Sequence, residues 1–130
     1  MRAAAAALLV LGLATGVVLG RQSSPSRRQR AELASLPWTC DATWYETGRT
    51  TANGERFDAR GLTAATRDLP FGTRLLVTDL YTQRSVVVRV NDRGPTPQTR
   101  CIDLTRGAFA RVSPLAEGVT AVRIERLPAP

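Results

Sequence analysis

The most constraining feature of this sequence is a pair of strand patterns separated by only four residues. Residues 73–80 and 85–91 are both rich in β-branched and aliphatic side chains. In the second run Val86, Val88 and Val90 fall on one face, and polar residues alternate with them towards its end. Two such runs with a short connection predict an antiparallel hairpin whose valine face is buried.

Four further strand patterns and one helix pattern accompany this hairpin. The strands are expected at 40–45, 62–66, 100–104 and 120–127, and the helix at 106–112. Asp103 or Thr105 can cap the helix, and Pro114 ends it. Six short strands and one short helix in about 90 residues predict a mainly β fold, a small six-stranded β-barrel.

The N-terminal segment predicts export. Residues 1–20 combine a charged start, an apolar run and small residues at its end, as in a signal peptide. An uncleaved membrane anchor is the alternative, because the run is about as long as the shortest spanning helices. No Cys lies in the run or directly after it, so an N-terminal lipid on Cys is excluded. We expect a basic flexible linker at 21–36, a folded domain at 37–127 and a tail at 128–130.

The amino-acid composition limits which partners and which kinds of catalysis are possible. The chain has 18 Lys+Arg against 11 Asp+Glu and no His, for a net charge of +7. An exported basic protein is expected to meet anionic cell-envelope polymers rather than nucleic acid. Without His, Ser-His and Cys-His nucleophilic catalysis is excluded. The sequence predicts no metal site and no cofactor, because scattered carboxylates do not form a zinc site.

Cys40 and Cys101 are the only cysteines. In an oxidising compartment such a pair predicts a disulfide. In the chain-entropy model, closing this loop stabilises the folded state by roughly 4 kcal/mol. A reactive thiol pair is the alternative, although a CxxC spacing is missing.

Carboxylates remain as candidate reactive groups, and two sets stand out. Glu55 and Asp58 follow the turn signal Asn53-Gly54 and lie on an exposed loop. Asp92 ends the strand at 85–91, where a side chain is both rigidly placed and open to solvent. Glycosidic cleavage needs an acid to protonate the leaving oxygen and a second polar group at the anomeric centre. The alternatives are that Asp92 only bonds its own turn and that the loop acids are only solvated.

Several motifs in order resemble the rare lipoprotein A family. They are 42–45 (ATWY), 49–58 (RTTANGERFD), 62–65 (LTAA), 69–74 (LPFGTR), 87–95 (VVRVNDRGP) and 102–105 (IDLT). The resemblance covers about residues 42–127. It implies a double-psi β-barrel, similar to the barrels of expansins and barwin.

The resemblance also implies an activity and a site. Family members are lytic transglycosylases that cut peptidoglycan glycan strands, preferably those without stem peptides, and leave 1,6-anhydro-N-acetylmuramic ends. Carried over by position, Asp92 is the catalytic acid/base, and Glu55 and Asp58 are further acids of the groove. Tyr45 is a candidate platform for a sugar ring. Substrate-binding positions are predicted at Tyr45, Thr66, Asn91 and Arg93. The partner is the glycan strand, with the protein acting as a monomer in the cell envelope or outside the cell.

One departure leaves alternatives open. The family has a His thought to assist catalysis where this chain has Thr66, and Thr cannot titrate near neutral pH. A non-catalytic, glycan-binding or wall-loosening barrel is therefore the second hypothesis. An inhibitor or partner-binding barrel is the third.

Overall fold

The structure is a computed structural model that describes residues 23–96 and 99–130. The predicted signal at 1–20 lies outside the described residues. Among those described, no helix has both the length and the apolar character needed to span a membrane.

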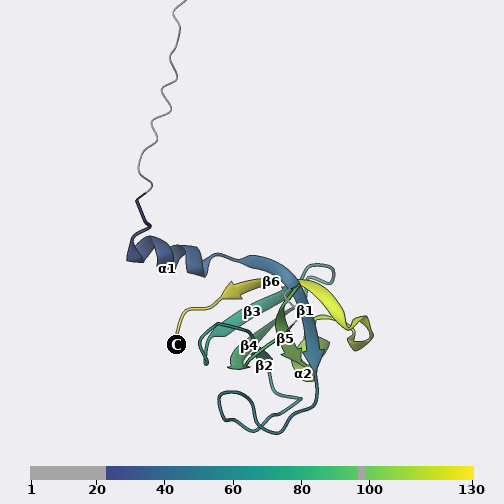
Figure 1. The fold of residues 1–130 in the computed structure, drawn as a ribbon. Helices are drawn as coiled ribbons and strands as arrows, with labels where there is room; N and C mark the ends of the chain where they lie inside the picture. The colour runs from purple at the N-terminus through teal and green to yellow at the C-terminus, as the bar shows by residue number, and fades with distance from the viewer. Residues whose placement is uncertain (1–22, 97–98) are drawn as a thin grey trace, which may run out of the picture.

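Within the described residues six strands close into a barrel in the order β1-β5-β2-β4-β3-β6 (Figure 1). Their bounds are β1 Trp38–Tyr45, β2 Thr63–Ala65, β3 Arg74–Asp79, β4 Ser85–Asp92, β5 Arg100–Thr105 and β6 Val119–Arg126. The pairs β1–β5 and β2–β4 are parallel, and the other four are antiparallel. The predicted hairpin is β3–β4, and the mainly β fold is confirmed.

The barrel interior is filled by one alternating set of aliphatic side chains. It contains Ala42, Ala64, Leu75, Val77, Val86, Val88, Val90, Ile102, Leu104, Val122 and Ile124, each buried. The predicted valine face of β4 therefore points inwards. Burial of these side chains is the main force that holds the six strands in register.

Helix α2, Arg106–Val112, covers one side of the barrel through Phe109. Its N-cap is Thr105, whose Oγ1 accepts a hydrogen bond from the Ala108 amide at 3.3 Å. Gly107 is required by a close approach: a Cβ there would lie 2.7 Å from the Arg60 carbonyl oxygen. Helix α2 therefore packs directly against the long loop that connects β1 to β2. Because Thr105 is the N-cap, Asp103 does not cap the helix.

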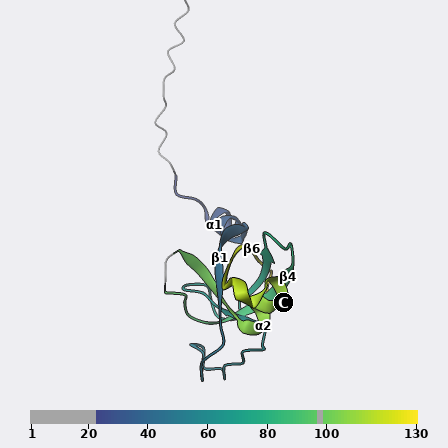
Figure 2. The same ribbon diagram turned by 90° about the vertical axis from the view of Figure 1, so that its right-hand side faces the viewer.

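The predicted linker is only partly irregular, because helix α1 spans Arg27–Ser35. A capping pair explains the helix. The Ser26 Oγ accepts from the Gln29 amide at 3.2 Å, and the Gln29 Oε1 accepts from the Ser26 amide at 2.8 Å. This part of the predicted linker therefore has regular secondary structure, and the flexibility of the linker stays a prediction. Helix α1 and the loop between β1 and β2 lie at opposite ends of the barrel (Figures 1 and 2).

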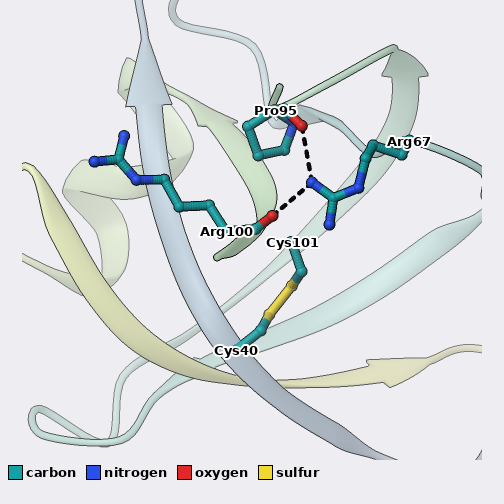
Figure 3. The surroundings of a disulfide bond; sticks show 5 residues. All are labelled: Cys40, Arg67, Pro95, Arg100 and Cys101. Carbon is teal, nitrogen blue, oxygen red and sulfur yellow. Dashed lines mark hydrogen bonds between the residues drawn. A yellow bond between two sulfur atoms is a disulfide. The ribbon is translucent and has the colours of Figure 1, made fainter. Parts of the chain in front are cut away.

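Cys40 and Cys101 form the expected disulfide. It joins β1 to β5, which already pair in parallel, and so fixes the start of β5 against the barrel (Figure 3). The alternative of a reactive thiol pair is excluded in this state, since neither Cys is free.

Candidate functional site

A β-bulge sets the direction of Asp92. Ala64 of β2 pairs with Val90 and the next residue, Ala65, pairs with Asp92, so Asn91 is an extra residue in β4. Val90 is buried in the core, and the extra residue reverses the alternation. Asp92 therefore lies beside Ala65 on the outer face of the barrel, half-buried.

Three donors hold the Asp92 carboxylate. The amides of Ala52 and Arg93 each donate to Oδ1 at 2.9 Å, and the Tyr45 hydroxyl donates to Oδ2 at 3.1 Å. Tyr45 and Ala52 are distant in sequence, so tertiary structure assembles this arrangement. Asp92 is therefore more than a turn residue that bonds its own backbone.

Tyr45 contributes its hydroxyl to this site and packs its ring elsewhere. The ring stacks on Phe57 with centroids 5.0 Å apart and an interplanar angle of 28°. Burial raises the pKa of Tyr45, and the nearby charge and hydrogen bond of Asp92 raise it further. The phenol therefore stays neutral and remains a donor to Asp92. Its predicted use as a sugar platform stays a prediction, with one face of the ring already covered.

Asp103 is a second carboxyl at this place, and sequence reasoning considered it only as a helix cap. It lies between Ile102 and Leu104, which both point into the core, so its side chain is on the outer face. The Thr43 hydroxyl donates to Asp103 Oδ1 at 3.1 Å. Burial raises the pKa of Asp103, and the charge of Asp92 adds to the rise, against the hydrogen bond from Thr43 and the charge of Arg100.

The register of the sheet brings these two acids together. Ala65 pairs with Asp103 on one side and with Asp92 on the other. Their Cα atoms are therefore about two strand spacings, or 10 Å, apart, with only a methyl group between them. We call Asp92 and Asp103 the carboxylate pair. The alternation of Ile102, Asp103 and Leu104 was the signal in the sequence that could have revealed it.

The predicted acids of the loop do not join this pair. Arg89 binds Glu55 in an ion pair, and Asn53 Nδ2 donates to Glu55 at 2.6 Å. These hydrogen bonds, first that from Arg89, lower the pKa of Glu55 to about 2, so it remains ionised. Exposed Asp58 accepts from the Arg60 amide at 2.9 Å and shapes a turn. Within the described residues neither acid shares a hydrogen bond with Asp92, so their catalytic role stays a prediction.

The remaining predicted positions are buried or occupied. Asn91 is only 3% exposed, and its Nδ2 points to Glu55 at 3.4 Å. Thr66 is 4% exposed, and its Oγ1 has no hydrogen-bond partner among the described residues. It lines a cavity of about 180 Å³ with Trp38, Leu69, Cys101 and Ile124, rather than the surface around Asp92. Neither position supports direct substrate contact in this conformation.

Arg93 also points away from the carboxylate that it follows. Its guanidinium lies 3.9 Å from the centre of the Phe71 ring and donates to the Leu69 carbonyl at 2.8 Å. The predicted contact of Arg93 with substrate stays a prediction.

The closed six-stranded barrel belongs to the class of double-psi β-barrels. A family model described as "Lytic transglycolase" matches residues 39–124. The chain therefore belongs to the lytic transglycolase family, and the resemblance to rare lipoprotein A is confirmed.

Curated relatives carry consistent names. "Endolytic peptidoglycan transglycosylase RlpA" of Neisseria meningitidis serogroup A is 35% identical over 113 residues, which are 85% of this chain and 46% of the relative. "Probable endolytic peptidoglycan transglycosylase RlpA" of Nostoc sp. is 55% identical over 80 residues, 62% of this chain and 22% of the relative. The chain thus spans less than half of the length of either relative.

Solved structures show the same fold. The Streptomyces papain inhibitor is 25% identical with a TM-score of 0.61, covering 72% of this chain and 96% of the inhibitor. The expansin of Clavibacter michiganensis is 20% identical with a TM-score of 0.63, covering 73% of this chain and 52% of the expansin. The expected likeness to expansin barrels is confirmed at the level of the fold.

Proposed function

We propose that this barrel is an endolytic lytic transglycosylase of peptidoglycan that acts in cell-wall organisation outside the cytoplasm. Its substrate is a glycan strand, preferably without stem peptides, and its product has a 1,6-anhydro-N-acetylmuramic end. The carboxylate pair on the outer face is the observation that carries the proposal. Family membership and the names of the relatives support it, and the disulfide fits an oxidising compartment.

In the proposed reaction Asp92 is the acid/base. Its proton passes to the glycosidic oxygen as the bond from that oxygen to the muramic anomeric carbon breaks. The muramic C6 oxygen then attacks the anomeric carbon, and its proton passes to Asp92. One C–O bond breaks, one forms, and Asp92 ends protonated as it began. No water is consumed.

Asp103 provides the second titrating group in this proposal. Burial, with a smaller addition from the charge of Asp92, raises the pKa of Asp103, so Asp103 retains a proton more readily than an exposed aspartate does. Asp103 can therefore supply a proton on the same outer face to Asp92, which must be protonated when it acts as the acid, while three donors fix the position of the Asp92 carboxyl group. Asp103 could then assist Asp92 in place of the family His, whose position is occupied by Thr66 in this chain. Thr43 fixes the orientation of Asp103 through its hydroxyl.

The direct test is digestion of purified glycan strands stripped of peptides. Mass spectrometry should detect anhydro-muramic ends with wild-type protein and none with Asp92→Asn. Products that carry a reducing muramic end instead would indicate hydrolysis, and would contradict the lytic reaction.

A second candidate function is a non-catalytic glycan-binding barrel. The observation that favours it is the buried, non-titrating Thr66 at the position where the family has a His. Retention on glycan in a pull-down, without any anhydro product, would establish this function and exclude the first. Thr66→His is a further check: a rise in cleavage rate would show that the missing imidazole limits the reaction.

A further inference from the structure

The turn that carries Asp92 is held by a guanidinium from a different segment. Arg67 Nη1 donates to the carbonyl oxygen of Pro95 at 2.8 Å and to that of Arg100 at 2.6 Å (Figure 3). Pro95 lies three residues after Asp92, and Arg100 begins β5. One side chain therefore joins the turn after β4 to the strand that bears Asp103.

Arg93 makes the reciprocal connection. Its guanidinium donates to the carbonyl oxygens of Leu69, at 2.8 Å, and Thr66, at 3.3 Å. Its stacking on Phe71 adds a cation–π contact. Each of the two segments, 66–71 and 92–95, thus sends one arginine to the backbone of the other. We call these two side chains the arginine clasp.

The arginine clasp contacts the turn at residues 92–95, which contains a conformationally flexible glycine. The backbone of Gly94 has φ 132°, a conformation open mainly to glycine, which is also the most flexible residue when unsupported. The direct backbone bond between the segments is that from the Thr66 amide to the Asp92 carbonyl, at 3.2 Å. A guanidinium presents several N–H donors in a rigid plane, so one arginine can bind two carbonyl oxygens of different segments.

We propose that Arg67 and Arg93 are positioning residues, which hold the Asp92 carboxylate against the Ala52 amide and the Tyr45 hydroxyl. Arg67 in addition ties this turn to the disulfide-bonded strand, because Arg100 precedes Cys101. Misplacement of a reacting group by 1 Å costs about 100-fold in rate. The link to rate rests on the proposed function, whereas the link to the position of Asp92 does not.

The test follows the amide of Ala52 by NMR during a pH titration. This amide donates to Asp92 Oδ1, so its chemical shift reports the ionisation of that carboxyl without any need for cleavage. The variants are Arg67→Ala, Arg67→Lys and Arg93→Ala. Arg111→Ala is the matched control, because the exposed Arg111 side chain makes no hydrogen bond within the described residues. All proteins are measured well below their melting temperatures.

We expect Arg111→Ala to titrate like wild type, and Arg67→Ala and Arg93→Ala to lose at least two thirds of the shift amplitude at Ala52. On glycan strands, kcat should fall about 10- to 100-fold with KM changed less than threefold. Arg67→Lys should recover part of both signals, since an ammonium also donates hydrogen bonds to carbonyl oxygens but lacks the planar geometry of the guanidinium.

The outcomes separate the two proposals. An unchanged Ala52 titration in Arg67→Ala would overturn the clasp whatever the cleavage assay shows. A lost titration with kcat retained would overturn its link to the reaction. If Arg67→Ala and Arg93→Ala lose the pH-dependent shift at Ala52 but the wild-type protein does not cleave glycan, the clasp is established and the proposed function is wrong. Where Arg67→Ala does not fold, the same criteria apply to Arg67→Lys and Arg93→Ala.

Discussion

Two aspartates end neighbouring strands of this barrel, and their surroundings differ in two respects, burial and the origin of their hydrogen-bond donors. Asp79, at the end of β3, is fully buried and accepts from the Tyr81 and Thr82 amides at 2.7 and 2.9 Å. A third bond comes from the Thr120 hydroxyl at 2.7 Å. Burial alone would raise the pKa of Asp79, but these hydrogen bonds lower it overall.

Asp92 also accepts three hydrogen bonds, but it is half-buried and two of its donors come from more than 35 residues away in sequence. Two of the three donors to Asp79 are backbone amides of its own turn. A carboxylate bonded by its own turn and closed to solvent stabilises a hairpin. One that is assembled from distant segments and left open to solvent is available to a substrate. The same residue type thus serves the scaffold at one strand end and the candidate reaction at the other.

The largest expected effect comes from Asp92→Asn. Cleavage should fall about 1000-fold, because acid/base catalysis contributes roughly 100- to 10,000-fold and an amide cannot exchange the proton. The amide keeps the shape of the side chain, and the Tyr45 hydroxyl can accept from it instead of donating. The melting temperature should change by less than about 3 °C. Full activity in this variant would place the acid elsewhere.

Asp79→Ala should give the opposite result. It removes three hydrogen bonds and leaves buried donors unpaired, at a cost of about 3 kcal/mol. For a domain of this size that lowers the melting temperature by on the order of 15 °C. Below that temperature cleavage per folded molecule should stay within twofold of wild type. A comparable loss of cleavage would break the contrast between the two aspartates.

The strands and the place of Asp92 at a strand end could be predicted from the sequence, because both depend on local patterns. The strand alternation fixes which valines point inwards, and it predicted all six strands to within about two residues. Asp92 was identified from its place at a strand end. The cap of helix α2 and the disulfide also follow from residues near in sequence or unique in type.

What could not be predicted depends on contacts between distant segments. The bulge at Asn91, which turns Asp92 outwards, exists only in the pairing of β2 with β4. Glu55 resembled a groove acid because nothing local shows that Arg89 binds it. Asp103 was considered, with Thr105, as the cap of helix α2, and the structure shows that Thr105 is the cap. Helix α1 was missed because its basic residues outweighed the capping pair of Ser26 and Gln29.

Asp103→Asn tests the second member of the carboxylate pair. We expect cleavage to fall about tenfold, less than the roughly 100-fold minimum for loss of a direct acid/base, because Asp103 only assists Asp92. One ionisation should also disappear from the pH profile of cleavage. The pKa of Asp103 is raised in the folded state, so wild-type stability falls as pH rises from the unfolded pKa through the folded one. Asn removes that penalty.

The melting temperature of Asp103→Asn at pH 7 should therefore equal or exceed that of wild type. A lower melting temperature, together with unchanged cleavage, would show that Asp103 is a structural residue like Asp79.

The smallest effect is expected for Glu55→Gln. The pKa of Glu55 is lowered to about 2 by the hydrogen bond from Arg89, followed by that from Asn53. Its stabilising effect is therefore present above the unfolded pKa of about 4.5 and is lost as pH falls towards 2. The difference in melting temperature between wild type and Glu55→Gln should shrink from pH 6 to pH 2.5, and it should be small throughout, since the pair is exposed to solvent. Cleavage should stay within threefold of wild type. A loss of cleavage as large as that of Asp92→Asn would instead show that Glu55 takes part in the reaction despite its ion pair with Arg89.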